Sequence, residues 1–170
     1  HKRKRQNSSD DAEGGDGNQT SRVRASVTDL PDGETYEVFL SFRGEDTRKE
    51  FTDHLYNRLV NMGVRVFRDS EALRIGEKIG PELDKAIKAS KISIPIISPD
   101  YASSKWCLQE LVHILECKKT TGQVVLPIFY RVEPGSVRHQ NGTFEKAFRL
   151  HEKKYGSNSK IVKEWRNALA

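Results

Sequence analysis

Residues Tyr36–Phe42, with the sequence YEVFLSF, are the stretch that decides the fold class. They are mostly apolar and rich in aromatic residues, which is typical of a short strand buried on both faces. Four apolar residues then recur at helical spacing, namely Phe51, Leu55, Leu59 and Met62. A buried strand followed by an amphipathic helix predicts the start of a strand–helix–strand unit in a parallel sheet.

The same alternation continues outward from this unit to the last residue. Thr47 and Glu50 fit a capping box that would open the first helix. The further strands that we expect are Val64–Phe67, Lys91–Ser98 and Gln123–Tyr130. The further helices that we expect carry the apolar sets Ile79/Leu83/Ala86/Ile87 and Leu108/Leu111/Val112/Leu115, and then span Thr143–Lys154 and Lys160–Ala170.

This pattern predicts an α/β fold with a doubly wound parallel sheet covered by helices on both faces. Such sheets bind ligands beyond the carboxyl ends of their strands, which here means the loops after Phe42, Phe67 and Ser98. Pro95 and Pro127 fall inside two of the expected strands, although proline lacks the N–H group that a central strand uses. Either they mark bulges or local strand ends, or one of these strands is an edge.

The chain divides into a tail and one domain. It has 170 residues, of which 35% are hydrophobic, but residues 1–35 contribute only five hydrophobic residues and show no periodicity. We therefore expect residues 1–35 to be disordered and residues 36–170 to form a single domain with an ordinary core.

Charge and hydropathy narrow the classes of partner. The net charge of +5 is moderate and scattered, and no motif interleaves aromatic with basic residues, so nucleic acid is not expected as a main partner. No apolar run approaches the ~18 residues of a membrane span. We expect a cytoplasmic, reducing location. The basic run Lys2-Arg3-Lys4-Arg5 could be a nuclear-import signal, and the alternative is a run of charged residues that is simply solvated.

Several familiar kinds of site are excluded. The chain has neither the Gly-x-Gly-x-x-Gly loop of dinucleotide folds nor a Walker lysine loop, and its histidines and cysteines lack metal-site spacing, so no metal is expected. A phospho-receiver domain shares the strand–helix alternation but needs carboxylates after its first and third strands. Ser41, Phe42, Arg43 and Ser98 occupy those places here.

On the helix expected to carry Leu108 and Leu111, two further residues lie outside the apolar stripe. Trp106 and Glu110 are four residues apart, so they share a helix face that is rotated away from the leucines. A carboxylate beside an indole at the mouth of the sheet would be partly desolvated, as catalytic acids often are. The alternative is a surface glutamate in an early helical turn, favoured by the helix dipole. Spacing alone favours this alternative.

The order and spacing of five motifs resemble those of plant TIR domains, from about Tyr36 to Ala170. These domains are the amino-terminal signalling modules of many nucleotide-binding, leucine-rich-repeat immune receptors. The motifs are Tyr36–Arg48, Phe67–Asp69, Ser104–Leu111, Leu126–Tyr130, and Glu133-Pro134 with Val137-Arg138.

The resemblance implies a flavodoxin-like sheet of five parallel strands in the order 2-1-3-4-5. In the family the final strand follows the last helix. We therefore expect this chain to stop before that strand and to expose the sheet edge where it would pair.

The resemblance also implies an activity, the cleavage of NAD at the nicotinamide–ribose bond, with NAD as a substrate and no permanently bound cofactor. Glu110 matches the family's catalytic glutamate. The implied partners are other TIR domains, in homo- or hetero-oligomers, and downstream nucleotide-binding and leucine-rich-repeat domains. The competing hypothesis is a non-catalytic adaptor that acts only through TIR–TIR contacts.

Further roles are implied for residues near the expected mouth and on the first helix. Arg43 could pair with a phosphate or form a salt bridge with Glu45 or Asp46, and Trp106 could wall the ribose or pack under the loops. The expected substrate-binding residues are Phe42, Arg43, Gly44, Ile75, Gly76 and Trp106, and the expected self-association residues are Asp53 and His54.

Overall fold

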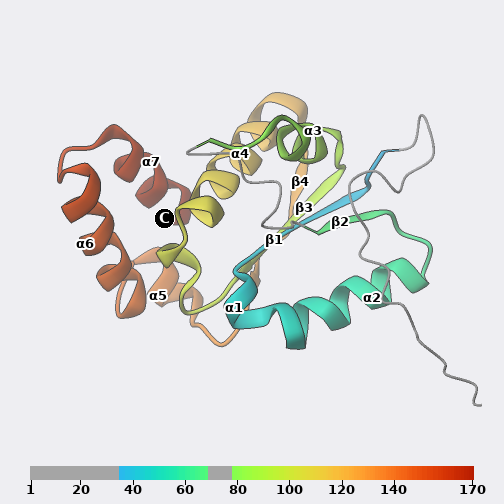
Figure 1. The fold of residues 1–170 in the computed structure, drawn as a ribbon, viewed down its shortest axis with the longest axis horizontal. Coiled ribbons are helices and arrows are strands. Elements are labelled where there is room, and N and C mark those ends of the chain that lie inside the picture. Colours follow the sequence, from blue (N-terminus) through green and yellow to red (C-terminus); the bar gives the residue numbers. More distant parts are fainter. Residues whose placement is uncertain (1–34, 69–77) are drawn as a thin grey trace, which may run out of the picture.

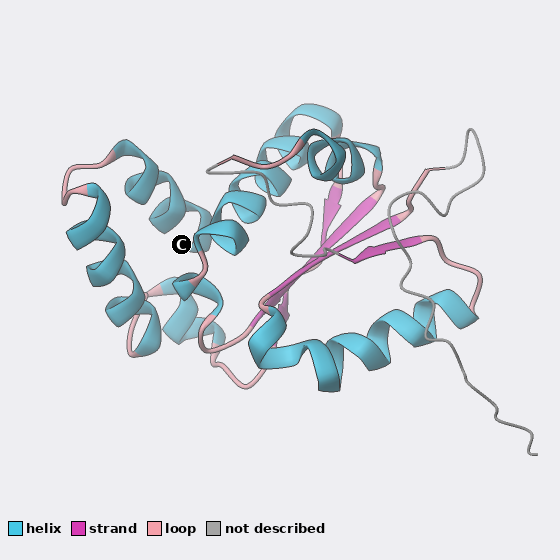
Figure 2. Ribbon diagram, in the orientation of Figure 1, coloured by secondary structure: helices cyan, strands magenta, loops and turns pink. Residues whose placement is uncertain are grey.

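In the computed structural model, which describes residues 35–68 and 78–170, the strands form one parallel sheet. The strand order is β2-β1-β3-β4, and β5 also pairs with β3, so the expected order 2-1-3-4 is confirmed. The helices lie on both sides of the sheet, as Figure 2 shows. The strands are β1 (Val38–Phe42), β2 (Val66–Arg68), β3 (Ile92–Ile97), β4 (Val124–Val125) and β5 (Ile128–Phe129).

The expected fourth strand, Gln123–Tyr130, is in fact the two short strands β4 and β5, separated by Leu126-Pro127. The carbonyls of Ser93 and Ile97 accept hydrogen bonds from the N–H groups of Leu126 (3.0 Å) and Tyr130 (2.8 Å). Alternate residues of a strand turn their main-chain groups to the same neighbour, so Pro95 also faces this pair of strands. Pro95 therefore lies where the ladder is interrupted, and Pro127, which is adjacent to Leu126, has its missing N–H group on the side away from β3.

The helical segments follow the expected alternation, with one short helix, α5, that the sequence did not predict. They are α1 (Gly44–Thr47), a π-helical turn (Arg48–Thr52), α2 (Asp53–Asn61), α3 (Pro81–Ala89), a 3₁₀ turn (Tyr101–Ser103), α4 (Lys105–Thr121), α5 (Pro134–Arg138), α6 (Thr143–Tyr155) and α7 (Lys160–Leu169). In Figure 1, α2 lies on one side of the sheet, α3 and α4 lie on the other, and α5–α7 gather beyond one end of it.

The alternation of side chains along β1 separates the two faces of the sheet. Val38, Leu40 and Phe42 pack in the cluster that includes Leu55 and Leu59 of α2. Phe39 points the other way and packs with residues of α3 and α4. Ser41 shares the α4 side with Phe39, so a polar group interrupts that face near the carboxyl end of the strand.

The capping box predicted for Thr47 and Glu50 is wrong, because the first helical turn begins earlier, at Gly44. Thr47 is the last residue of α1, and its hydroxyl contacts the Thr52 hydroxyl at 2.7 Å across the π-helical turn. A π-helical turn is a rare feature that often occurs near functional sites. Both threonines are buried, so this hydroxyl pair closes the widened turn where a side-chain cap was expected.

Helix α4 is covered on two sides, which the leucine stripe alone did not indicate. Ile114 and Cys117 pack with Phe39 of the sheet. Leu108 and Leu111 instead join the cluster formed with α6 and α7. The face of α4 that lies away from the leucines is therefore directed at β1, not at solvent.

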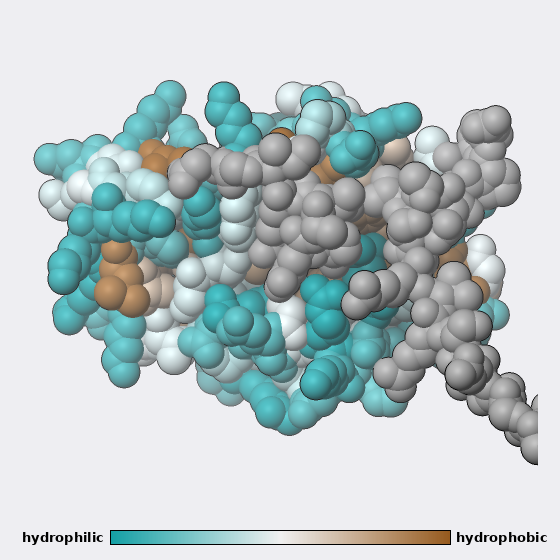
Figure 3. Space-filling model, viewed as in Figure 1, coloured by the Kyte–Doolittle hydropathy of each residue, from teal (hydrophilic) through white to brown (hydrophobic). Residues whose placement is uncertain are grey.

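The edge formed by β4 and β5 exposes apolar side chains. Val124, Leu126 and Phe129 are 49%, 50% and 40% exposed. This is the edge where the resemblance placed a further strand. On the face drawn in Figure 3, outside the area covered by grey residues, hydrophobic residues form small patches between hydrophilic ones. Within the described ranges, no helix combines the length and the apolar character needed to cross a bilayer.

Candidate functional site

A cluster of three buried polar side chains lies at the carboxyl end of β1. The Ser41 hydroxyl donates a hydrogen bond to Oε2 of Glu110 at 2.8 Å. It also contacts the Tyr101 hydroxyl at 2.8 Å, and Tyr101 reaches the Cys107 carbonyl at 3.1 Å. Ser41 and Tyr101 are fully buried, and Glu110 is 1% exposed. The acid therefore lies at the predicted edge of the sheet, covered from solvent and hydrogen-bonded to a strand residue.

Three separate elements bring this cluster together. Ser41 belongs to β1, Tyr101 opens the 3₁₀ turn after β3, and Glu110 lies in the second turn of α4. The Ser104 side chain caps α4 by accepting a hydrogen bond from the Cys107 N–H at 3.3 Å. The Cys107 thiol in turn donates to the Phe42 carbonyl at 3.6 Å. The start of α4 is thus tied to the end of β1, which fixes where Glu110 meets the strand.

Burial determines the protonation of Tyr101. Desolvation is the main cause that raises the pKa of its hydroxyl well above the ordinary value, and the nearby Cys107 and Glu110 raise it further. The hydrogen bond with Ser41 lowers the pKa by a smaller amount. The phenol therefore keeps its proton throughout the physiological pH range and can act as a hydrogen-bond donor.

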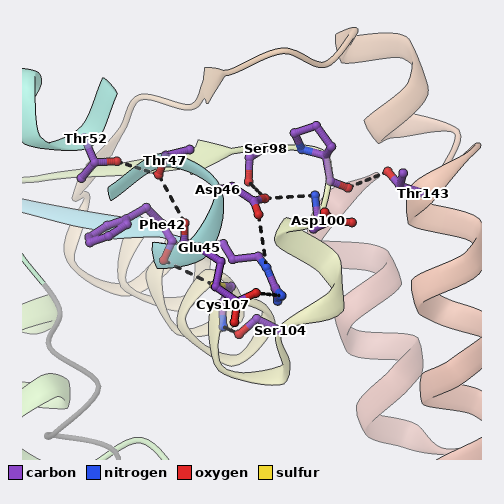
Figure 4. Close-up of polar contacts among 12 residues, drawn as sticks. Phe42, Glu45, Asp46, Thr47, Thr52, Ser98, Asp100, Ser104, Cys107 and Thr143 are labelled. Atoms are coloured by element: carbon purple, nitrogen blue, oxygen red, sulfur yellow. Dashed lines mark hydrogen bonds and ion pairs between the residues drawn. The ribbon is translucent and has the colours of Figure 1, made fainter. Parts of the chain in front are cut away.

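A second group of polar contacts joins α1, which follows β1, to the loop after β3 (Figure 4). The Asp46 carboxylate accepts hydrogen bonds from the Ser98 hydroxyl (2.5 Å) and the Asp100 N–H (3.2 Å). Arg43 lies 3.4 Å from Asp46 and 2.6 Å from Glu45. The salt-bridge alternative for Arg43 is thus the arrangement present, and any phosphate at Arg43 would have to compete with two carboxylates.

Phe42 and Gly44 both contact Arg48, a residue to which the sequence assigned no role. The Arg48 guanidinium lies 5.1 Å from the centre of the Phe42 ring. A side chain at Gly44 would begin 3.0 Å from Nε and Nη2 of Arg48. Gly44 does allow a close approach, as expected, but the group that approaches is Arg48. Phe42 is 2% exposed and faces α2, whereas Glu110 lies on the opposite face.

The remaining expected substrate residues are described only in part. Trp106 is half-buried, and the Lys105 ammonium lies 4.7 Å from the centre of its ring. Ile75 and Gly76 lie outside the described residues, as does the basic run Lys2–Arg5. Within the described part of the chain, no group of three or more histidine, cysteine or carboxylate side chains is placed to hold a metal ion.

The expected self-association residues differ from each other in their surroundings. Asp53 forms an ion pair with Arg68 at the end of β2. The same guanidinium stacks 4.3 Å from the centre of the Tyr56 ring. His54 is exposed. A partner could therefore reach His54 directly, whereas Asp53 would first have to leave its contact with Arg68.

Sequence reasoning selected Glu110 but missed the two hydroxyls that hold it. Ser41 was considered only as the wrong residue for a phospho-receiver, and Tyr101 was not singled out. Ser41 is the penultimate residue of β1 and Tyr101 lies four residues after β3, so both are near the carboxyl end of a buried strand, where parallel sheets bind ligands. That position was the signal that could have identified them.

Comparisons with known proteins agree on one family. A family model described as the TIR domain matches residues 35–170. Disease resistance protein RPV1 from Vitis rotundifolia is 51% identical over 154 residues, which cover 88% of this chain and 11% of that protein. TMV resistance protein N from Nicotiana glutinosa is 51% identical over 135 residues, which cover 79% of this chain and 12% of that protein.

A solved structure agrees with these relatives. It is described as the activated Roq1 resistosome directly recognizing the pathogen effector XopQ, in its TIR domains. It matches with a TM-score of 0.74 and 46% identity, over 79% of this chain and 81% of that one. The chain spans only about a tenth of the length of the curated relatives that it matches.

Proposed function

Because this chain belongs to the TIR domain family, we propose that it hydrolyses NAD at the nicotinamide–ribose bond as a cytoplasmic immune-signalling module of a plant disease resistance protein. The observation that carries the proposal is the Glu110 carboxyl group, which a strand serine holds at the carboxyl edge of a parallel sheet. Ligands of such sheets bind at that edge. Glu110 is also the residue that the sequence motif selected independently of any contact.

The chemistry requires only one carboxylate. Nicotinamide is a cationic leaving group in NAD, so the bond electrons pass to its ring nitrogen and no general acid is needed. Positive charge develops on the ribose, and a fixed carboxylate near the sugar stabilises it. Water then attacks the ribose carbon. The products are nicotinamide, ADP-ribose and one proton.

Access to Glu110 requires a conformational change, since the side chain is 1% exposed. We propose that contact with other TIR domains drives this change, so that activity depends on self-association. The solved structure that this chain matches holds the TIR domains of Roq1 in an activated resistosome, which is in keeping with this proposal. His54, which is exposed on α2, is a residue that a second copy could contact directly.

The burial of Glu110 also supports the second candidate function, a TIR–TIR adaptor without catalysis. In that case the acid would be a buried structural group and the exposed helices would provide the contacts. The two functions make different predictions about NAD and the same prediction about self-association.

Nicotinamide release from NAD by concentrated protein separates the two functions. We expect a rate per molecule that rises with protein concentration, and we expect Glu110→Gln to reduce it at least about 100-fold, since electrostatic groups at a reacting centre contribute that much. Glu116→Gln is the matched control, because Glu116 is an exposed glutamate on the same helix. Equal rates for the wild type and Glu110→Gln would exclude Glu110 as the catalyst, and no nicotinamide release by the wild type would leave only the adaptor.

A further inference from the structure

The cluster around Glu110 contains two hydroxyl groups to which the proposed reaction assigns no part. Ser41 and Tyr101 are both fully buried, one on β1 and one after β3. Burying a hydroxyl group is unfavourable unless it is hydrogen-bonded, and an apolar residue would fill either position without that requirement. Their presence next to a buried acid therefore calls for an explanation.

We propose that Tyr101 and Ser41 form a directed pair of hydrogen bonds that positions the Glu110 carboxylate for reaction. The inference rests on the proposed function, and it adds two positioning residues to the one catalytic residue. Neither hydroxyl group touches the substrate. Their role is to fix the orientation of the carboxylate before the sugar arrives.

Counting hydrogens gives the pair its direction. The single hydroxyl hydrogen of Ser41 is directed at Glu110 Oε2, 2.8 Å away. The 2.8 Å contact between the Ser41 and Tyr101 oxygens then needs the tyrosine hydrogen. The longer 3.1 Å contact from Tyr101 to the Cys107 carbonyl is the weaker branch. The one hydrogen of Tyr101 is thus shared between Ser41, at the shorter distance, and the Cys107 carbonyl, and Ser41 donates to the acid.

Both donors stand on well-supported elements. The strand β1 lies in the middle of the sheet, between β2 and β3. The 3₁₀ turn that begins with Tyr101 is held by the carboxyl-terminal helices, because Nε2 of His151 on α6 contacts the Ala102 carbonyl at 2.8 Å. Thr143, also on α6, donates to the Pro99 carbonyl at 2.5 Å. A carboxylate held from such a frame has little freedom to turn, which is what a positioned group requires.

The test compares hydroxyl deletions at the two ends of the sheet. Ser41→Ala removes the donor to the acid, and Tyr101→Phe removes the second donor while keeping the ring. Ser93→Ala is the matched control, because Ser93 is equally buried and donates at 2.9 Å to Gln123, a neutral amide. All three are assayed for nicotinamide release, and circular dichroism gives the folded fraction.

We expect Ser41→Ala to lower kcat about tenfold and Tyr101→Phe about threefold, with KM changed less than twofold, since a hydrogen bond to a charged group is worth more than a neutral one. Ser93→Ala should keep the kcat of the folded protein. Ser41→Thr, which retains a hydroxyl group, should recover most of the rate lost in Ser41→Ala.

The outcomes separate this inference from the function on which it rests. Wild-type kcat in Tyr101→Phe and in folded Ser41→Ala, while Glu110→Gln is inactive, would overturn the positioning role alone. Full activity in Glu110→Gln would overturn the catalytic role of Glu110, and no nicotinamide release by the wild type would overturn the proposed function. If Ser41→Ala does not fold, Tyr101→Phe decides the matter, because wild-type kcat in that variant also contradicts the proposal.

Discussion

The two ends of the sheet each bury a cluster of polar side chains, but the clusters are built differently. At the amino end of β3, Gln123 accepts a hydrogen bond from Ser93 at 2.9 Å and donates to the carbonyls of Ile87 (2.6 Å) and Ser90 (2.7 Å). At the carboxyl end of β1, Ser41 and Tyr101 converge on Glu110. The first cluster contains only neutral groups, and the second contains a carboxyl group and a phenol.

The difference indicates a division of labour between the two ends. Gln123 links the end of α3 to β3 and β4. A neutral amide whose hydrogen bonds are all made is suited to a purely structural role. An ionisable acid is poorly suited to a purely structural role, because burying its charge costs free energy. Its presence at the end where parallel sheets bind ligands fits a chemical role. The variants below test this division, from the largest expected effect to the smallest.

Gln123→Leu should cause the largest loss of stability. It leaves the Ile87 and Ser90 carbonyls and the Ser93 hydroxyl without the amide that they contact. We expect the free energy of unfolding to fall by about 3 kcal/mol, the cost of two or more buried polar groups left unsatisfied. Urea denaturation measures it.

The control for this substitution is Gln140→Leu. Gln140 also makes hydrogen bonds through both ends of its amide, to Arg166, but it is only half-buried. Its loss should cost about 1 kcal/mol, since water can replace its contacts. Equal losses in the two variants would contradict the structural role assigned to the amino-end cluster.

Alkaline pH should act on the carboxyl-end cluster through Tyr101, whereas the amino-end cluster holds only neutral amide and hydroxyl groups. Burial raises the pKa of Tyr101 well above its ordinary value, so the folded state keeps a proton that the unfolded state releases above about pH 10. Stability from this group is therefore complete below pH 10 and declines as the pH rises, by about 1.4 kcal/mol at pH 11. Tyr101→Phe should reduce the difference in unfolding free energy between pH 9 and pH 11 by that amount, whereas an unchanged difference would argue against it.

Asp46→Asn should give the smallest effect and one that depends on salt. Asp46 links α1 to the loop after β3 and contacts Arg43. The asparagine amide keeps one acceptor but loses the charge, so we expect a cost of about 1 kcal/mol at low salt that shrinks in 1 M salt. Asp100→Asn is the control, because only the main chain of Asp100 takes part in this contact. If the loss of unfolding free energy did not change with salt, the ion pair with Arg43 would make no electrostatic contribution to stability.

The order of elements could be predicted from sequence because it depends on local pattern. Apolar runs and helical periodicity placed β1, β3 and α4 correctly. The fourth strand was predicted too long, because its interruption depends on how the segment pairs with β3, where Pro95 lacks an N–H group. The prediction of a capping box at Thr47 was wrong for a similar reason. Thr47 forms a hydrogen bond with Thr52 across a π-helical turn that no sequence motif predicted.

The site could be predicted as a position but not as a set of contacts. The motif selected Glu110, and the strand order gave the edge where it lies. The burial of Glu110 depends on the packing of α4 between the sheet and the helices α6 and α7. The leucine stripe predicts contact on only one of these two sides. The engagement of Arg43 by Glu45 and Asp46 was one of two open alternatives, and only tertiary structure decided between them.

The most direct test measures stability and nicotinamide release together in Glu110→Gln and Gln123→Leu. We expect opposite profiles: Glu110→Gln should unfold within about 1 kcal/mol of the wild type and lose at least about 100-fold in rate, and Gln123→Leu should lose stability but keep the rate of each folded molecule. If Glu110→Gln lost stability and retained the rate, the acid would be a structural group, and the division between the two ends of the sheet would be wrong.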